Sequence, residues 1–370
     1  MWNDKRGKVG KLNYFSVSFE SLMINTREEL RDEILKRGSS ILDAWIGDIR
    51  TKKKILAILL AGKHLLLEGL PGSGKTLIAR ELAKALPAMK AMDCDFNCIP
   101  EQRTCPQCTA EKGSLSIRSR AKVVDISGEK RFVRIQGSPE LTAEDLVGDI
   151  DPVLAFKFGP FDPRAFKPGK IIRANRNILF VDEINRVPER LQNTLLQVLQ
   201  ERLITIGGLE IEFGIDTVFI ATMNPEEHAG VYRISEALKD RLEKVKIDYP
   251  SSDEELRILK LYGTQLGANV SEDLEKRMVD IVQRIRGDKD VDQPASVRAT
   301  LAMYEIAQSY ALLRGDKQVN VEDLKEATMV ALDGRVTLSP ESPYYEDPTR
   351  YLSDIIDYAF DGDKRGNFRT

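Results

Sequence analysis

The chain contains no long apolar stretch and very little histidine. No hydrophobic run approaches the roughly 18–20 residues that a membrane-spanning helix needs, so we expect no membrane span. The longest candidate, Ile55–Leu60, is short and flanked by lysines. No apolar segment follows the charged N-terminus Met1–Lys11, which argues against a secretory signal, and a cytoplasmic location is expected by default. The two histidines, His64 and His228, are too isolated to suggest a metal site.

The sequence also lacks a charge bias of either sign. Lysine and arginine total 55 against 58 aspartate and glutamate, which gives a net charge of −3. No basic excess points to nucleic acid, and no acidic tail points to a basic partner. At 370 residues the chain exceeds the usual size of one hydrophobic core, so two domains are expected.

Cysteine is scarce as well, but its four copies are clustered. They are Cys94, Cys98, Cys105 and Cys108, spaced C-x₃-C-x₆-C-x₂-C. Thiolates are soft ligands, and four of them complete a tetrahedral Zn²⁺ site with no open position. In a cytosolic protein such a cluster favours metal over disulfides. The spacing therefore predicts structural zinc, with redox-sensitive disulfides, an iron–sulfur centre or free thiols as the alternatives.

Apolar strand patterns alternate with helical ones in the first two thirds of the chain. The predicted buried strands are His64–Glu68, Phe132–Ile135, Ile178–Val181 and Thr217–Thr222. This alternation predicts an α/β fold with a parallel sheet between helices, whose ligands bind beyond the carboxyl ends of the strands. From Ser252 onward the periodicity is helical, which predicts a second, α-helical domain.

We expect four segments along the chain. They are an N-terminal extension at 1–40 with a helix near Thr26–Arg37, an α/β core at 41–250, a helical domain at 251–340 and a tail at 341–370 with a helix at Tyr351–Phe360. Three insertions interrupt the core. They are 91–130, which holds the cysteines and a hairpin of Ala121–Ile126 with Lys130–Ile135; 149–170, more loop or hairpin than helix; and 203–213, a hairpin turning at Gly207-Gly208.

A glycine-rich segment after the first predicted strand matches a phosphate-binding loop at every fixed position. It reads Gly69-Leu70-Pro71-Gly72-Ser73-Gly74-Lys75-Thr76, fitting G-x-x-x-x-G-K-[ST], and a helix follows it. Glycines let successive backbone N–H groups point at phosphate oxygens, and the helix N-terminus adds partial positive charge. Lys75 is expected to reach the β- and γ-phosphates of ATP, and the Thr76 hydroxyl to ligate Mg²⁺.

Polar residues end two other predicted strands. Asp182 closes an apolar strand and is expected to bind Mg²⁺, and Glu183 is placed to polarise the attacking water. This pair predicts a Mg²⁺-dependent ATPase that hydrolyses ATP to ADP and phosphate. Asn224, after the next strand, can hydrogen-bond the water or the γ-phosphate, although Asn before Pro is also common turn chemistry.

One segment is locally basic. It contains Arg118, Arg120, Lys122, Lys130, Arg131 and Arg134. A run of this kind is usually the solvated face of a hairpin, and we favour that interpretation over a nucleic-acid surface.

Taken in order, these motifs resemble the AAA+ ATPases, specifically the MoxR and magnesium-chelatase I-subunit clade. The resemblance covers Ile41 to Arg335. Its MoxR-like segments are Arg134-Ile135-Gln136 with Gly148, Asp182–Pro188, Gln200–Gly208, Asn224-Pro225 and Ser235–Arg241. Its chelatase-like segments are Cys94–Cys98 and Ala165–Gly169. The chain thus lies between the two branches.

The resemblance implies a P-loop AAA+ core with a C-terminal α-helical lid, assembled as a homo-hexameric ring with ATP between neighbours. It gives Asn224 the sensor-1 role, Arg241 the role of the arginine finger that reaches the neighbour's γ-phosphate, and Arg298 the sensor-2 role on the lid. It makes 149–170 the helix-2 insertion and 203–213 the pre-sensor-1 hairpin. Leu242 departs from the clade, where a Phe is common after the finger.

The function expected from this resemblance is an ATP-driven motor that remodels a partner protein, with a von Willebrand A-domain protein as a candidate partner. One alternative is the motor subunit that powers metal insertion into a tetrapyrrole. Another is a DNA-translocating motor, since the MCM helicases share the hairpin insertions, but the pI of about 5.8 argues against it. A nucleotide-gated scaffold without turnover is a further alternative, against which the intact Glu183 argues.

Overall fold

The computed structural model describes residues 25–101, 103, 105–109, 122–160, 162–206, 211–225 and 232–361. Most of the N-terminal extension, Arg118 and Arg120, the Gly207-Gly208 turn, His228 and the last nine residues lie outside this description. The chain forms two compact units. The first comprises Met1–Leu42, Lys53–Glu68 and Thr76–Val245; the second comprises Asp43–Lys52, Gly69–Lys75 and Lys246–Thr370.

A five-stranded sheet forms the centre of the first unit. Its order is β11 (Leu242–Lys246), β1 (His64–Glu68), β10 (Thr217–Met223), β7 (Asn177–Asp182) and β4 (Phe132–Gln136). The pairings β1–β10, β10–β7 and β7–β4 are parallel, so the carboxyl ends of these four strands share one edge. β1, β7 and β10 are almost completely buried because their residues are apolar on both faces. The predicted α/β fold is confirmed.

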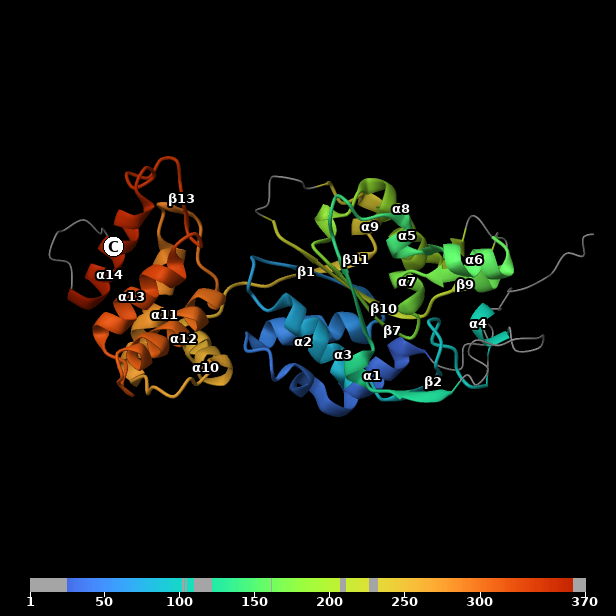
Figure 1. Ribbon diagram of the computed structural model, residues 1–370, viewed down its shortest axis with the longest axis horizontal. Helices are drawn as coiled ribbons and strands as arrows, with labels where there is room; N and C mark the ends of the chain where they lie inside the picture. The colour runs from blue at the N-terminus through green and yellow to red at the C-terminus, as the bar shows by residue number, and fades with distance from the viewer. Residues whose placement is uncertain are drawn as a thin grey trace, which may run out of the picture. The chain divides into compact units, whose positions relative to one another are not determined.

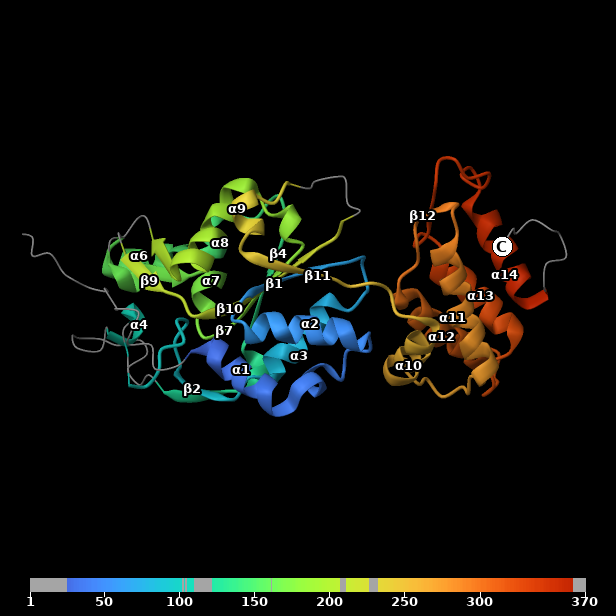
Figure 2. The ribbon, with the colours of Figure 1, turned by 180° about the vertical axis from the view of Figure 1, so that it is seen from behind.

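Helices cover both sides of this sheet (Figures 1 and 2). α2 (Ile49–Leu60) and α3 (Lys75–Ala85) lie on one side, and α8 (Glu189–Glu201) and α9 (Glu236–Lys239) lie on the other. Each long helix turns an apolar stripe inward. α3 buries Ile78, Ala79, Leu82 and Ala83, and α8 buries Leu191, Leu195, Val198 and Leu199.

The N-terminal helix α1 (Thr26–Arg37) is tied to the first unit by charged groups. The Thr26 N–H and hydroxyl both donate to one carboxylate oxygen of Asp216, at 2.7 Å each. Glu29 of the same helix accepts from the Arg131 guanidinium at 2.6 Å, and the Arg131 side chain is fully buried. Because charges are costly to bury unpaired, this ion pair makes α1 part of the packing of the unit.

The hairpin expected next to the cysteines is wrong. β3 (Val123–Ile126) pairs antiparallel with β2 (Met89–Met92), whereas β4 lies in the central sheet beside β7. A short 3₁₀ turn, Gly128–Lys130, separates β3 from β4. A Cβ at Gly128 would lie 2.3 Å from the Leu86 carbonyl oxygen, so this turn packs directly on backbone and sends the two strands to different sheets.

Two hairpins project from the core. The first pairs β5 (Gly148–Ile150) with β6 (Phe166–Pro168) and carries the helix α6 (Pro152–Phe158), with α5 (Ala143–Leu146) before it and α7 (Lys170–Arg173) after it. The sequence did not predict α6. The Asp151 side chain caps it by accepting from the N–H groups of Val153 and Leu154, and proline occupies its first turn. The second hairpin pairs β8 (Leu203–Ile206) with β9 (Ile211–Gly214).

The C-terminal helices of the described residues belong to the second unit. They are α10 (Ser252–Tyr262), α11 (Glu272–Gly287), α12 (Val297–Leu313), α13 (Val321–Leu332) and α14 (Pro348–Asp361), with a small sheet of β12 (Val291–Gln293) and β13 (Thr337–Leu338). Four of these helices begin at capping side chains, namely Ser251, Ser271, Ser296 and Asn320. Among the helices in the described ranges, none is long and apolar enough to cross a bilayer.

A buried ion pair joins three helices of this unit. Arg286 of α11 donates to Glu255 of α10 at 2.5 and 3.0 Å, and the Thr300 hydroxyl of α12 donates to the same carboxylate at 2.5 Å. α14 adds Tyr351, Leu352 and Ile355 to the same hydrophobic core. The helix expected at Tyr351–Phe360 therefore packs with the helical domain.

Candidate functional site

The glycine-rich loop that follows β1 has the backbone conformation its sequence requires. Gly72 and Gly74 have φ angles of 76° and 86°, a region that side chains other than glycine rarely adopt. The Lys75 ammonium donates to the carbonyl oxygens of Gly69 and Leu70, at 2.5 and 2.8 Å. Lys75 also begins α3, so its charge and the first N–H groups of a helix are contributed by the same short segment.

Neighbours within the second unit press closely on this loop. A Cβ at Gly72 would lie 2.6 Å from the Ser296 Cβ, and one at Gly74 would lie 2.8 Å from the Trp45 ring. The Trp45 indole N–H donates to the Ser73 carbonyl at 3.3 Å. The sequence did not single out Trp45, because one tryptophan ahead of a helix is typical of an ordinary core residue. A side chain at either glycine would therefore clash with these neighbours, in addition to having an unfavourable φ.

Arg298 also belongs to the surroundings of the loop. It is the second residue of α12, where its N–H donates to the Ser296 hydroxyl that caps the helix, at 3.3 Å. Its Cγ is 3.9 Å from the position of a Cβ at Gly72. The second unit thus places Arg298, to which the resemblance gives the sensor-2 role, beside Gly72 of the loop that ends in Lys75 and Thr76.

In the first unit, Asp182 is held by two side chains at the carboxyl end of β7. One carboxylate oxygen accepts from the Thr222 hydroxyl at 2.5 Å, and the other forms an ion pair with Arg134 at 2.5 Å. Thr222 lies on β10 and Arg134 on β4, the strands on either side of β7. Arg134 is therefore not simply part of a solvated basic face, as its surroundings in the sequence suggested.

Glu183 is fixed in an unusual backbone conformation. Its φ is 54° and its N–H donates to the Thr222 hydroxyl at 2.9 Å. Its carboxylate accepts from Gln136 at 3.0 Å and from Arg186 at 3.3 Å. A left-handed non-glycine residue costs of order 1–3 kcal/mol and persists only where its surroundings enforce it. Gln136, which sequence reasoning did not identify as functional, is one of the groups that position the Glu183 carboxylate.

Asn224 reaches the same edge of the sheet, directly after β10. It is 8% exposed, and its backbone carbonyl oxygen accepts from the Asn185 amide at 3.1 Å.

Arg241 precedes β11 and has a 44% exposed side chain that pairs with Asp240 at 2.6 Å. With the Gln200 amide turned to accept, Arg241 also donates to its oxygen at 3.2 and 3.3 Å.

Three family models match successive parts of the chain. They are "Magnesium chelatase, subunit ChlI" at residues 44–98, "ATPase family associated with various cellular activities (AAA)" at 110–243 and "AAA lid domain" at 288–354. The first two matches cover segments that contain strands of the central sheet, and the third covers part of the C-terminal helices. The chain is an AAA+ ATPase of the MoxR and magnesium-chelatase clade.

Relatives of this AAA+ chain come from both branches of the clade. Uncharacterized protein YeaC of Bacillus subtilis is 28% identical over 78% of this chain and 82% of its own length. Chaperone MoxR1 of Mycobacterium tuberculosis is 28% identical over 80% and 73%, respectively. The magnesium-chelatase subunit ChlI homolog of Methanocaldococcus jannaschii is 26% identical over 81% and 86%. A model of the complex between BchI and BchD of magnesium chelatase, based on a cryo-EM reconstruction, aligns with 86% of this chain and 95% of the other at 20% identity, with a TM-score of 0.41.

The four cysteines of this AAA+ chain come together in the first unit. Their sulfur atoms all lie within 4.8 Å of one another, and Cys98, Cys105 and Cys108 are buried. Hydrogen bonding from Cys105 lowers the pKa of Cys94 to about 7, while the pKa of Cys105 itself is raised, first of all by its hydrogen bond to Cys108. Four sulfurs this close resist ionising together unless a cation shares their charge, so the donor set fits a soft metal ion.

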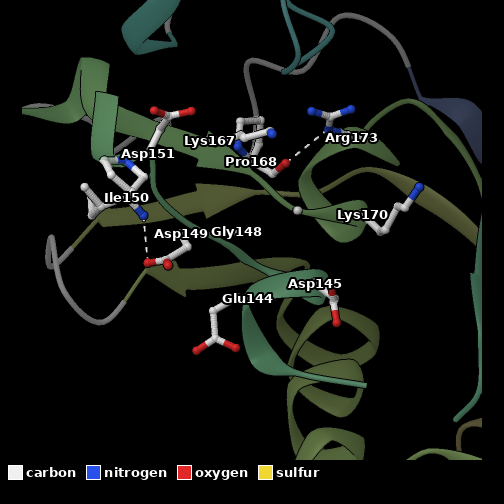
Figure 3. A pocket seen from close by; sticks show the side chains of 12 residues that line it. Glu144, Asp145, Gly148, Asp149, Ile150, Asp151, Lys167, Pro168, Lys170 and Arg173 are labelled. Atoms are coloured by element: carbon white, nitrogen blue, oxygen red, sulfur yellow. Dashed lines mark hydrogen bonds between the residues drawn. The ribbon is translucent and has the colours of Figure 1, made fainter. Parts of the chain in front are cut away.

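A surface pocket of about 450 Å³ lies along the β5–β6 hairpin (Figure 3). It is lined by Glu144, Asp145, Gly148, Asp149, Ile150, Asp151, Pro152, Lys167, Pro168, Gly169, Lys170 and Arg173. The Arg173 guanidinium donates to the Pro168 carbonyl at 3.1 Å and holds α7 against the hairpin. Because none of the nucleotide motifs lines it, this pocket belongs to the insertion of the ATPase and not to its phosphate loop.

Proposed function

We propose that the chain binds Mg·ATP through the loop Gly69–Thr76 and hydrolyses it with groups at the carboxyl edge of its sheet. Membership of the AAA+ ATPases implies ATP hydrolysis. Dependence on Mg²⁺ and the roles of single residues are the parts proposed here. The observation that carries the proposal is the paired arrangement of Asp182 and Glu183, each held by side chains from the neighbouring strands.

The residues that would serve the metal ion have suitable chemistry. Mg²⁺ prefers oxygen ligands and usually keeps several waters, so one hydroxyl and one carboxylate from the protein are sufficient. Thr76 supplies the hydroxyl and Asp182 the carboxylate. Bound there, Mg²⁺ would neutralise charge on the β- and γ-phosphates.

Each of the remaining groups has a separate role in phosphoryl transfer. The Glu183 carboxylate orients and polarises the attacking water, and the Asn224 amide holds the water or the γ-phosphate. Lys75 and Arg298 supply positive charge to the phosphates of their own chain. Arg241 supplies charge to the ATP of a neighbouring subunit, which requires a ring, and we propose a homo-hexamer.

Calorimetry of the full-length protein tests the binding step. Mg·ATP should bind the wild-type chain, and Lys75→Ala should weaken binding by about 10- to 100-fold, because a charge-assisted hydrogen bond is worth roughly 1.5–3 kcal/mol. Lys84→Ala is the matched control, since Lys84 lies on the same helix α3, away from the loop, and its 47% exposed side chain pairs with Glu81 at 2.7 Å. Equal affinity of Lys75→Ala and wild type would contradict the proposed site.

The proposed task of the ring is to remodel a partner protein in the cytoplasm, with a von Willebrand A-domain protein as the candidate partner. The relative named as a chaperone supports this reading. A motor subunit for metal insertion into a tetrapyrrole is the second candidate, favoured by the chelatase model match at 44–98 and by the chelatase-subunit relative. A DNA-translocating role is not favoured by these comparisons.

We propose further that Cys94, Cys98, Cys105 and Cys108 hold one structural Zn²⁺. The short distances between the four sulfurs support it, as does the burial of Cys98, Cys105 and Cys108. A closed all-thiolate site leaves no position for catalysis, so the role would be structural. Elemental analysis of the purified protein should find about one zinc per chain, and Cys105→Ser should lose it. Iron in place of zinc, or metal-free protein whose four thiols all react with an alkylating reagent, would contradict this assignment.

A further inference from the structure

One side chain inside the first cysteine turn touches both projecting hairpins. Phe96 lies between Cys94 and Cys98 and is 1% exposed. Its ring centroid is 6.4 Å from that of Phe166 on β6 and 5.4 Å from that of Phe213 on β9. In both views of the ribbon α4 (Pro106–Thr109), α6 and β9 lie at the same end of the first unit (Figures 1 and 2). The cysteine turn is therefore the common neighbour of the two insertions.

The same turn is also bonded to the segment that leads into β7. The Asn97 amide donates to the carbonyl oxygens of Arg173 and Asn175, at 2.8 and 3.1 Å. The Arg176 guanidinium returns a hydrogen bond to the Asn97 carbonyl at 2.7 Å. Asn97 has a φ of 52°, a conformation that asparagine tolerates better than most residues. Phe96 is thus presented from a turn that is anchored to the sheet.

Hydrogen bonds between Asp95 and Gln107 join the two cysteine pairs. The Asp95 N–H and carboxylate form two hydrogen bonds with the Gln107 side chain, both of 3.0 Å. Gln107 belongs to α4, which has only four residues and is too short to be stable alone. A metal ion shared by the four sulfurs would join α4 to the turn that carries Phe96, and would fix the position of the Phe96 ring.

We infer that the cysteine site is a brace for the two insertions: metal bound by the four thiolates fixes Phe96 against Phe166 and Phe213, and so orders both hairpins. The inference rests on the zinc proposed above and assigns that site a task in the motor. The β5–β6 and β8–β9 hairpins are then positioned from one point. Loss of the metal, by chelation or by oxidation of the thiols, would loosen both at once.

Hydrogen exchange of the full-length protein tests the brace. In Phe96→Ala, peptides covering 148–168 and 203–214 should exchange at least about tenfold faster than in wild type, while helix α11 is unchanged. Metal analysis of the same sample should still find zinc, because no ligand has been removed. Phe219→Ala is the matched control, since Phe219 is equally buried but its ring contact is with His64 in the central sheet, at 5.9 Å. Phe96→Leu repeats the test with a smaller loss of volume if Phe96→Ala does not fold.

Zinc removal by a chelator provides the second arm. It should accelerate exchange in both hairpins together, to the extent seen in Phe96→Ala. Unchanged exchange in the zinc-containing Phe96 variants overturns the brace, as does acceleration of only one hairpin. If the wild-type protein binds no zinc, and changing Phe96 still reduces order in both hairpins, the metal has no part in the brace. The aromatic contacts of Phe96 then account for it alone. ATP affinity measured on the same samples reports separately on the nucleotide site.

Discussion

Glu183→Gln should reduce ATP turnover by about 10²–10⁴-fold and leave Mg·ATP binding within about twofold of wild type. The amide has the size of the carboxylate and can still accept from Gln136, whose hydrogen bond to Glu183 is 3.0 Å long. It cannot take a proton from water, so the loss falls on the chemical step. The Thr222 hydroxyl accepts from the Glu183 backbone N–H, which the substitution keeps, so the φ of 54° and the fold should not be disturbed.

The measurement is phosphate release at saturating ATP together with calorimetric affinity. Glu189→Gln is the matched control, since Glu189 is an exposed carboxylate in the first turn of α8, six positions further along the chain. A Glu183→Gln protein that keeps wild-type turnover would remove this carboxylate from the mechanism. A variant that loses both turnover and ATP binding would instead show that Glu183 helps to build the site.

Arg241→Ala should lose about 10³–10⁵ in turnover, as for an arginine that stabilises the transferring phosphoryl group from a neighbouring subunit. Mixed with Lys75→Ala, which is inactive through its own loop, it should regain part of the activity. The intact loop of one chain then faces the intact arginine of the other. The Arg241 side chain is 44% exposed, so the substitution should cost little stability.

Turnover is measured across mixing ratios at constant total protein. Arg190→Ala, which changes an exposed arginine on α8, should be fully active and serves as the control for loss of surface charge. Recovery that peaks at an intermediate ratio supports a site shared between subunits. No recovery at any ratio, with mixed assembly verified by mass, would place Arg241 outside the neighbour's site.

The features predicted correctly from sequence are those with a local pattern. The β1 strand and the loop at Gly69–Thr76 adjoin in the chain, and each is specified by residues a few positions apart. The Arg134–Asp182 pair was missed because it depends on which strands become neighbours. In the sequence, β4 and β7 are separated by the β5–β6 hairpin and by α5, α6 and α7, and their register, Gln136 opposite Asp182, exists only in the folded sheet.

The hairpin near the cysteines was predicted wrongly for the same reason, because the pairing of its strands depends on distant parts of the chain. The residues 121–135 alternate and turn at Ser127-Gly128, which is a good local signal for two adjacent strands. What decides against it is that β7 offers β4 a buried partner strand with an apolar centre, Ile178–Val181, whereas β2 offers β3 a partner beside the cysteines. Trp45 and α6 were missed for different reasons. Trp45 contacts the loop through a long-range hydrogen bond to Ser73, which the sequence does not reveal. The Phe- and Gly-rich composition around α6 suggested a loop, but the capping side chain of Asp151 favours a helix.

Helix α1 limits how far the protein can be trimmed. A shortened ATPase that began near Ile41 would retain the phosphate loop and yet delete Glu29, the anion opposite a guanidinium with no access to water. Breaking such a buried pair costs about 3–5 kcal/mol, here lessened by the carbonyl oxygens of Pro87 and Arg176 that also accept from Arg131. A stable fragment of this ATPase should therefore keep Glu29 and begin before Ile41.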